Sequence, residues 1–239
     1  MNTDTFSESH EIHRRAEVLT APSPEEEVGW LEEDPDVYPD VWFRPDLVDE
    51  TPRPRLWENG RRLTSTRADA YEWWYLDGQF TNGMMVEVTF FYCLDEDGTM
   101  IPRINLRIVS KENSVLVDQK VYFDPAQLSI SEEDIVVSMG SSYFRSVGGR
   151  DVYEIFVDPI MNNGFGVQLM LERSGASFRL DAGHTSNHAG DHFFAWLCAV
   201  PAGLMTGTIT ARGKIIPVDG SGYQDHCWGD DPINLMLGG

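Results

Sequence analysis

Residues 71–98 of the 239-residue chain read YEWWYLDGQFTNGMMVEVTFFYCLDEDG, and they contain the signals of an antiparallel hairpin. Asn82-Gly83 is typical of a two-residue hairpin turn, because both residues tolerate the positive φ angles that such a turn needs. The stretches on either side, Tyr71–Tyr75 and Met84–Leu94, are rich in aromatic and apolar residues that favour strands. A second turn signal, Asp95–Gly98, ends the segment. We therefore predict two paired strands here.

The strand pattern continues toward the C-terminus. In Val167–Glu172, the apolar residues at 167, 169 and 171 fall on one face of a pleat, as a half-buried antiparallel strand requires. Further strands are predicted over Ile101–Val109, Val115–Phe123, Val152–Val157, Val167–Glu172 and Thr206–Ile216. No window of about twelve residues in this region has a helical period. We predict an all-β fold, a closed or nearly closed antiparallel barrel or sandwich.

The chain is strongly acidic, with 39 acidic and 18 basic residues, a formal net charge of −21 and 41% hydrophobic residues. Nucleic acid is excluded as a partner, because phosphate binding needs a basic surface. Association with anionic membranes is not expected for the same reason. Residues 1–60 hold 16 of the acidic and 5 of the basic residues. We expect an acidic, partly disordered arm over 1–60, either solvated or docking a partner, and a β domain over 61–239.

No segment is typical of targeting or of membrane insertion. The N-terminus, Met1–Asp4, lacks the basic start and the apolar run of a secretory signal. The longest apolar run, Phe193–Val200, is too short to span a bilayer. Three cysteines, Cys93, Cys198 and Cys227, do not suit a disulfide framework. We expect a reduced, cytoplasmic protein.

The sequence lacks the signatures of several enzyme classes. It contains no Gly-x-Ser-x-Gly nucleophile elbow, no P-loop and no paired Cys-x-x-Cys motif, and the missing nucleophile disfavours a hydrolase. His184, His188 and His192 recur every four residues, but the residues between them suit a loop better than a helix. We expect loop histidines with ordinary hydrogen bonds and no metal, with a metal site at these residues as the alternative.

Two segments, 71–78 and Gly222–Gly229, mix aromatic and polar residues densely. On a strand, alternation places Tyr223, Asp225 and Cys227 on one face and Gln224, His226 and Trp228 on the other. An aspartate beside a tyrosine inside an apolar barrel has a raised pKa, because burial disfavours the anion, and it can donate a proton near neutral pH. The alternative is an aspartate that caps a turn while Trp228 fills the barrel.

Three stretches together resemble the hydroxyneurosporene synthase (carotenoid hydratase) and AttH-like family: Glu72–Gly78, Trp196 with Val200-Pro201, and Gly222–Gly229. The resemblance covers about residues 65–239. It implies a lipocalin-like antiparallel β-barrel or sandwich, the first of two successive β halves. Because the chain ends at Gly239, soon after the last of these stretches, the resemblance implies a truncated or unusually short member.

The resemblance to the hydratases implies that Trp196, Tyr223 and Asp225 are catalytic. In that chemistry a buried acid protonates an alkene, aromatic faces stabilise the carbocation, and water then adds. The sequence departs from the hydratase pattern where Phe194 replaces a histidine and Cys227 replaces an asparagine.

The complete set of candidate residues has two parts. The catalytic candidates are Asp225, Tyr223, Trp196 and His226. The ligand-binding candidates are Glu72, Trp73, Trp74, Tyr75, Phe90, His192, Phe194 and Trp228.

We predict an enzyme that binds an apolar polyene, terpenoid or polyketide substrate and catalyses acid-assisted hydration or cyclisation without a cofactor. A pericyclic ring closure would need only a shaped apolar pocket and one or two hydrogen-bond donors. The alternative is a non-catalytic carrier of a lipid or small hydrophobic molecule, because the same barrel binds without reacting. The expected partner is a small hydrophobic substrate, and nothing in the sequence indicates an oligomeric state.

Overall fold

A single antiparallel sheet accounts for the described part of the chain. The computed structural model describes residues 59–147, 151–186 and 192–230, with the side chains of all but 178–186. These residues belong to one unit, Asp40–Gly239, and they form a sheet of twelve strands in which all pairs are antiparallel. The predicted all-β antiparallel fold is confirmed.

In the described residues the strands follow one another along the chain, with the short 3-10 helix η2 between the fourth and the fifth. They are β1 (Tyr71–Phe80), β2 (Met85–Leu94), β3 (Met100–Val109), β4 (Val115–Tyr122), η2 (Pro125–Gln127), β5 (Leu128–Ile130), β6 (Val136–Met139), β7 (Ser142–Ser146), β8 (Val152–Val157), β9 (Phe165–Arg173), β10 (Phe178–Ser186), β11 (Phe193–Ala211) and β12 (Lys214–Gly229).

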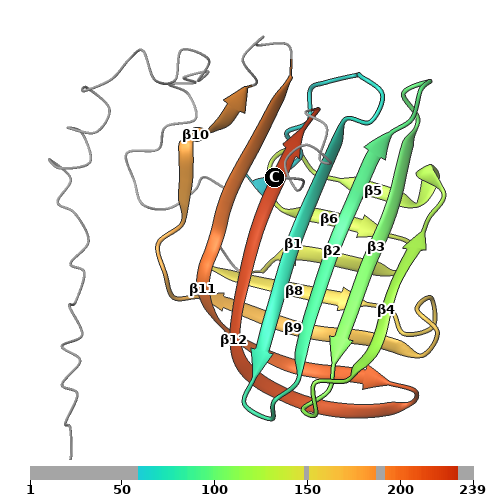
Figure 1. Ribbon diagram of the computed structural model, residues 1–239, viewed down its shortest axis with the longest axis vertical. Coiled ribbons are helices and arrows are strands. Elements are labelled where there is room, and N and C mark those ends of the chain that lie inside the picture. The colour runs from blue at the N-terminus through green and yellow to red at the C-terminus, as the bar shows by residue number, and fades with distance from the viewer. Residues whose placement is uncertain (1–58, 148–150, 187–191, 231–239) are drawn as a thin grey trace, which may run out of the picture. The chain divides into compact units, whose positions relative to one another are not determined.

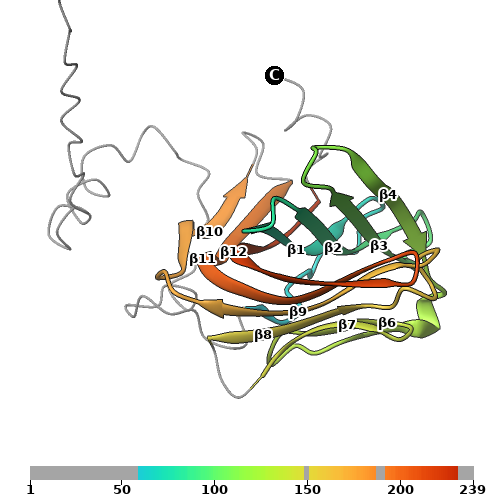
Figure 2. The ribbon, with the colours of Figure 1, turned by 90° about the horizontal axis from the view of Figure 1, so that it is seen from below.

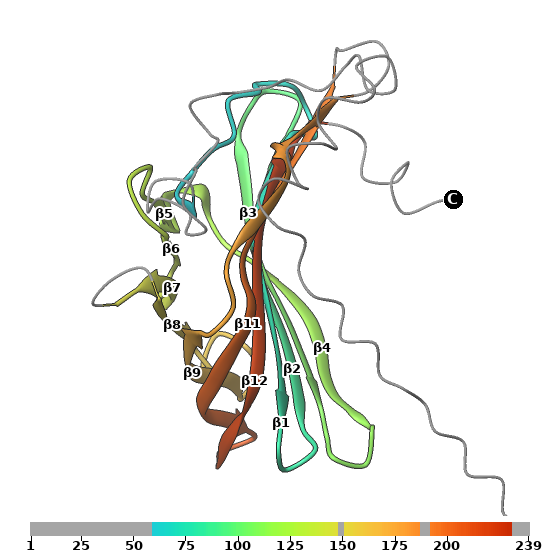
Figure 3. The same ribbon diagram turned by 90° about the vertical axis from the view of Figure 1, so that its left-hand side faces the viewer.

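The sheet curls into two layers. Its order is β4-β3-β2-β1-β12-β11-β9-β8-β7-β6-β5, and β10 pairs with β11 outside this path. Figure 1 shows β12, β1, β2 and β3 side by side in the front layer, with β5, β6, β8 and β9 crossing behind them. Figure 3 separates the two layers in a side view, and Figure 2 shows from below how β11 and β12 lie between the front strands and β9.

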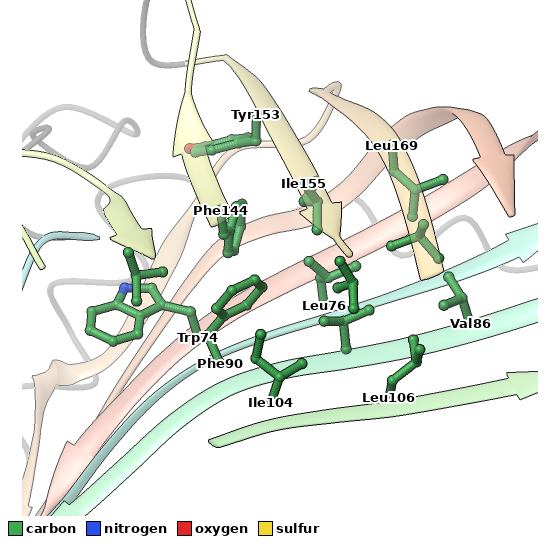
Figure 4. Close-up of a cluster of buried hydrophobic side chains, with 14 of the residues drawn as sticks. Trp74, Leu76, Val86, Phe90, Ile104, Leu106, Phe144, Tyr153, Ile155 and Leu169 are labelled. Carbon is green, nitrogen blue, oxygen red and sulfur yellow. The ribbon is translucent and has the colours of Figure 1, made fainter. Parts of the chain in front are cut away.

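Side chains of both layers meet in one hydrophobic core. Leu76 of β1 and Phe90 of β2 are fully buried from the front layer, and Phe144, Ile155 and Leu169 are fully buried from the back layer. Figure 4 shows these residues directed toward one another between the layers. The rings of Phe90 and Phe144 lie 6.3 Å apart between centroids. The core therefore depends on the alternation of apolar residues in strands from both layers.

β11 joins the two layers because it changes partner along its length. Its first residues pair with β10, and the segment from Gly203 to Ala211 pairs with β9. Within that segment, Gly207 has a φ of 146°, and a Cβ atom there would lie 2.1 Å from the carbonyl oxygen of Gln168. Only glycine allows β11 to approach β9 so closely.

Most predicted strands are confirmed, and one is wrong. β8 has the predicted bounds, and the predicted alternation of Val167–Glu172 holds within β9. Thr206–Ile216, predicted as one strand, contains the end of β11, a turn at Arg212-Gly213 and the start of β12. This turn lacks the Asn-Gly or Asp-Gly pair that marks hairpins in a sequence, and apolar residues continue on both sides of it.

Strands β5, β6, β7 and β10 were not predicted, and some predicted features lie outside the residues that the structure describes. β5, β6 and β7 have 3, 4 and 5 residues, so they are too short for a pattern of alternation to emerge. Residues 1–58 of the predicted arm, His188 and the side chain of His184 lie outside the described residues. Among the residues that the structure describes, no helix is both long and apolar enough to cross a membrane.

Candidate functional site

β12 places its polar residues on both faces of the front layer. Trp228 belongs to the core cluster and His226 is fully buried beside it, so these two side chains lie on the inner face. Side chains alternate along a strand, so Tyr223, Asp225 and Cys227 lie on the opposite, outer face. β1 pairs with β12 so that Trp74 is opposite His226 and Tyr75 is opposite Asp225. The predicted division of Gly222–Gly229 between two faces is confirmed.

Asp225 is the centre of a hydrogen-bonded group on the outer face. The Tyr223 hydroxyl donates to its Oδ2 at 2.8 Å, and Trp196 Nε1 donates to the same oxygen at 3.3 Å. Cys227 Sγ lies 3.8 Å from Oδ1. Trp196 comes from β11, where it is paired with Cys227. The structure therefore brings together the three positions that the hydratase resemblance implies, on a half-buried carboxyl group.

Burial governs the protonation of this group. Burial raises the pKa of Asp225, and the hydrogen bonds from Tyr223 and Trp196 only partly oppose this effect. Burial and the neighbouring Asp225 charge raise the pKa of Tyr223. Burial also raises the pKa of the Cys198 thiol to about 11, and that of Cys227 as well. Of these four groups, Asp225 is the one able to give up a proton near neutral pH.

A second tyrosine and aspartate lie beside the first pair on β1. The Tyr75 hydroxyl donates to Asp77 Oδ2 at 3.2 Å, and the rings of Tyr75 and Tyr223 lie 6.2 Å apart between centroids. Burial raises the pKa of Asp77, and the Glu87 charge adds to the effect. The outer face thus carries two carboxyl groups, each with a tyrosine donor.

An aromatic strip, consisting of Tyr71, Trp73, Phe91 and Phe194, continues this face. Trp73 stacks on Tyr71 and Phe91 at centroid distances of 5.2 and 6.2 Å, and Phe194 lies tilted against it at 6.3 Å. The Arg103 guanidinium lies 3.8 Å from the Phe91 ring centroid. Trp73 is paired with Cys227, so the strip begins next to the Asp225 group.

Glu72 is the centre of a different network on the inner face, where it is fully buried. Its Oε1 accepts from the Arg62 amide at 2.6 Å and from His226 Nε2 at 2.8 Å. Its Oε2 accepts from the Leu63 amide at 3.3 Å and from the Tyr92 hydroxyl. Four donors around one carboxylate compensate the cost of burying its charge. This arrangement is typical of a structural carboxylate.

His226 is packed between two tryptophans of the same network. Its ring stacks on Trp74 at 4.7 Å and lies 4.6 Å from Trp228, between centroids. Burial lowers the pKa of His226, although Glu72 acts in the opposite direction. The buried imidazole is therefore neutral near pH 7 and donates through Nε2 to Glu72.

The segment Asn59–Leu63 covers this network. The Asn59 carbonyl accepts from Trp74 Nε1 at 2.8 Å, and the Asn59 side chain exchanges hydrogen bonds of 3.3 and 3.4 Å with Gln224. The Arg61 amide donates to the Ser131 carbonyl at 2.8 Å. These bonds connect the segment to both layers, so the Glu72 network is enclosed on the inner face.

The candidate residues consequently fall into two groups that the sheet separates. The outer face carries Asp225, Tyr223, Trp196, Trp73, Tyr75 and Phe194, whereas the inner face carries His226, Glu72, Trp74, Phe90 and Trp228. His192 precedes β11, where its Nδ1 lies 2.8 Å from the Asp230 carbonyl oxygen and its ring contacts Arg67. Asp225 and Tyr223, expected inside the barrel, lie on its outside because the register turns Trp74 and Trp228 inward.

Several residues of these groups were not among the candidates. Asp77 and Cys198 belong to the outer group, and Asn59 and Tyr92 belong to the inner network. The Tyr-x-Asp spacing of 223–225 also occurs at 75–77, but it occurs at 38–40 and 122–124 as well, so by itself it is a weak signal for Asp77. The other three become neighbours of the site only through strand pairing and packing, so no local pattern indicates them.

A metal site is not formed by the residues whose side chains are described, since no group of three or more His, Cys, Asp or Glu among them could hold an ion. The alternative metal site at His184, His188 and His192 lies largely outside the described side chains.

Comparison with solved structures identifies the fold. A protein from Nitrosomonas europaea described as AttH (NE1406) matches 79% of this chain and 59% of its own with a TM-score of 0.60 and 16% identity. CghA, solved with Sch210972, matches 76% of this chain and 53% of its own at 13% identity, with a TM-score of 0.44. Kievitone hydratase from Nectria haematococca matches 71% and 51% at 12% identity, with a TM-score of 0.40.

The first of these likenesses shows the fold, and the predicted lipocalin-like architecture is confirmed. This chain spans about six tenths of the length of the Nitrosomonas protein. No protein-family model matches the chain, and a comparison with curated proteins finds no match. The resemblance to hydroxyneurosporene synthase in particular stays a prediction.

Proposed function

We propose that this protein is an acid catalyst that protonates a carbon–carbon double bond of an apolar substrate at Asp225 and thereby hydrates or cyclises it. The substrate class in this proposal is an apolar polyene, terpenoid or polyketide. Neither reaction oxidises or reduces the substrate overall, so the proposal includes no redox cofactor.

The observation that carries the proposal is the environment of the Asp225 carboxyl group. It is half-buried, burial raises its pKa, and Tyr223 and Trp196 hold one of its oxygens at 2.8 and 3.3 Å. Alkenes are weak bases, so their protonation is favoured by an acid that burial keeps protonated to higher pH and that is fixed in orientation.

The aromatic rings around Asp225 support a cationic intermediate. Tyr223, Tyr75 and Trp196 lie at the carboxyl group, and the aromatic strip starts at Trp73. The face of an aromatic ring attracts a cation through its quadrupole, by about 0.5–1 kcal/mol at an exposed site and by more where a bound substrate displaces water. A carbocation that forms next to Asp225 is therefore stabilised on this face.

The two outcomes share their first step. The Asp225 proton adds to one alkene carbon, and the neighbouring carbon becomes cationic. In hydration, a water oxygen bonds to the cation and one of the water protons is released. In cyclisation, a second double bond of the substrate attacks the cation, and a proton is lost from an adjacent carbon. In both cases a proton finally returns to Asp225.

Replacing Asp225 by Asn in the full chain tests this proposal. The probes are lycopene and geranylgeraniol in detergent micelles, with hydrated products detected by a mass gain of one water and cyclised products by NMR. We expect the variant to lose turnover by about a hundredfold or more while it retains binding, measured by quenching of tryptophan fluorescence. Asp118→Asn, an exposed aspartate on β4, is the matched control.

The carrier hypothesis predicts a different result. A carrier binds the probes but converts none of them, and Asp225→Asn then has no turnover to lose. Wild-type protein that binds either probe without hydrating or cyclising it would therefore contradict the proposal and favour the carrier.

A further inference from the structure

β1 and β12 carry the same short pattern in reciprocal register. Tyr75-Leu76-Asp77 lies in β1, and Tyr223-Gln224-Asp225 lies in β12. Because the strands are antiparallel, Tyr75 is paired with Asp225 and Asp77 is paired with Tyr223. Figure 1 shows these two strands side by side in the front layer. The four outer residues therefore form a square, with one tyrosine and one aspartate on each strand.

Hydrogen bonds run along the strands within this square. Tyr75 donates to Asp77 at 3.2 Å, and Tyr223 donates to Asp225 at 2.8 Å. The two aspartates occupy diagonal positions, which in antiparallel pairs lie about 7–8 Å apart at their Cα atoms. In inverting glycosidases, two carboxyl groups roughly 6.5–9.5 Å apart leave room for a water molecule between substrate and base, and side chains at diagonal positions on one face of a sheet can adopt such a separation.

We infer that Asp77 is a second catalytic carboxyl group of this site, which orients the attacking water and accepts its proton, so that the enzyme is a hydratase rather than a cyclase. This inference rests on the proposed function of Asp225. It adds the role of Asp77 and the choice of hydration over cyclisation, and either of these can be wrong while the role of Asp225 stands.

The reaction balances with these two groups. The Asp225 carboxyl proton forms a C–H bond at the alkene, whose π electrons are consumed, and the adjacent carbon becomes a cation. The water oxygen forms a C–O bond to this carbon while one water proton passes to the Asp77 carboxylate. Transfer of that proton from Asp77 to the Asp225 carboxylate restores both groups. One water has then been added across the double bond.

Asp77 is better placed to accept the water proton than the other carboxyl groups of this region, Glu87 and Glu72. Glu87 is paired with Asp77 on β2 but lies 3.5 Å from the Arg107 guanidinium, so its charge is already engaged. Glu72 lies on the inner face, where four donors surround it. Asp77 is half-buried on the same face as Asp225, and the raised pKa makes its carboxylate a stronger base than an exposed one.

A characteristic pH dependence follows for the pair. The rate requires a protonated Asp225 and an ionised Asp77, so it passes through a maximum and falls on both sides, with apparent pKa values that belong to the pair. The titratable or charged groups around these two carboxyls come from five strands: Tyr75 on β1, Glu87 on β2, Arg107 on β3, Cys198 on β11, and Tyr223, His226 and Cys227 on β12.

An experiment in D2O distinguishes protonation of the alkene by Asp225 from addition of water with the help of Asp77. Full-length wild type, Asp77→Asn, Asp77→Glu, Asp225→Asn and Asp118→Asn are incubated with geranylgeraniol in detergent micelles prepared in D2O. Hydration is measured as the alcohol formed, and protonation is measured as deuterium that enters the recovered alkene. We expect Asp77→Asn to form the alcohol about a hundredfold more slowly and still to incorporate deuterium. Asp77→Glu should recover part of the hydration, and Asp118→Asn should match wild type.

The outcomes distinguish this inference from the proposed function. If Asp225→Asn loses both readouts and Asp77→Asn hydrates like wild type, the role of Asp77 is overturned and that of Asp225 stands. If cyclised products form and depend on Asp225 but not on Asp77, the role of Asp77 is likewise overturned and that of Asp225 stands. If wild type incorporates no deuterium and forms neither the alcohol nor a cyclised product, both proposals are overturned.

A titration checks the pair without any substrate. Aspartate carboxyl carbons are followed by 13C NMR in wild type and in Asp77→Asn. In the proposed pair Asp77 ionises first, so it is charged while Asp225 titrates. If the two carboxyls form a pair, the apparent pKa of Asp225 therefore falls when the Asp77 charge is removed, because a neighbouring negative charge disfavours ionisation. An unchanged Asp225 titration in Asp77→Asn overturns the inference, and Asp118→Asn, on β4 beside Arg107, shows the size of shift that a more distant charge produces.

Discussion

Glu72 and Asp225 are two carboxyl residues of the same pair of strands, and their surroundings differ with the face on which each lies. Glu72 has no exposed surface and accepts from four donors. Asp225 is half-buried; Tyr223 and Trp196 donate to one of its oxygens, and among the described residues the other oxygen accepts only from the Cys227 thiol, a weak donor, at 3.8 Å. A carboxylate with every lone pair engaged stabilises the fold, whereas a desolvated carboxyl group with a weakly engaged oxygen can exchange a proton.

The buried histidine of the Glu72 network predicts how stability depends on pH. Burial lowers the native pKa of His226, so below about pH 6.5, the ordinary histidine pKa, the unfolded chain binds a proton that the native protein does not. The free energy of unfolding contributed by His226 is therefore fully present above about pH 6.5 and falls with decreasing pH, by up to about 1.4 kcal/mol per unit.

Urea unfolding of wild type and His226→Gln at pH 7 and pH 5 measures this effect. We expect a smaller loss of stability between these values in His226→Gln, because glutamine keeps an N–H donor but does not titrate. Asp77 and Asp225, whose pKa values are raised, contribute with the opposite sign but are present in both proteins and cancel in the comparison. Identical pH dependences would contradict the lowered pKa of His226.

Among the elements, β11 determines how the two layers are connected. It has 19 residues and pairs first with β10 and then with β9, while β12 remains its other neighbour. Gly207 lies in the segment where β9 approaches, and backbone atoms of Gln168 and Leu169 would lie within 3.0 Å of a Cβ atom at this position. The close passage of two backbones, rather than a turn, requires this glycine.

Replacing Gly207 by Ala should therefore destabilise the protein strongly. The added methyl group meets backbone atoms of β9, which cannot move aside like a flexible side chain, so we expect a loss of about 3 kcal/mol in the free energy of unfolding. Gly98→Ala is the matched control, because Gly98 also has a positive φ, 81°, but open space around its Cβ position. Equal losses in the two variants, measured by urea unfolding, would show that φ alone matters at Gly207.

For the described molecule as a whole, one core serves both layers. Residues of β1, β2 and β3 share a cluster with residues of β7, β8 and β9, and Figure 4 shows Leu76 and Phe90 facing Leu169 and Phe144. Neither layer buries its apolar face alone. The two layers should consequently unfold together.

Leu169→Ala tests this coupling from the back layer. A buried leucine replaced by alanine leaves a cavity and costs about 2–5 kcal/mol. We expect tryptophan fluorescence, to which Trp73, Trp74 and Trp228 of the front layer contribute, and far-UV circular dichroism to show the same lowered midpoint. Leu204→Ala, at a site 53% exposed, should leave the midpoint nearly unchanged. Separate midpoints for the two signals would mean that the layers unfold independently.

The site was only partly predictable from the sequence. Alternation along Gly222–Gly229 was sufficient to place Tyr223 with Asp225 and to separate both from His226, because a strand has a period of two. Alternation did not indicate which of these two faces of the strand points into the core. It also joined His226 and Asp225 in one predicted catalytic group, although the sheet lies between them.

The sequence by itself determined the all-β class, most of the strands and the side-chain parity within each, because these follow from local turn chemistry and from alternation. Tertiary structure alone decided that the Asp225 side of the sheet is the outer face, that Glu72, Tyr92 and His226 meet, and that Asp77 lies diagonally across from Asp225. The physical reason is that strand register and the curl of the sheet bring together residues about 150 positions apart in the chain, whose contacts leave no local pattern.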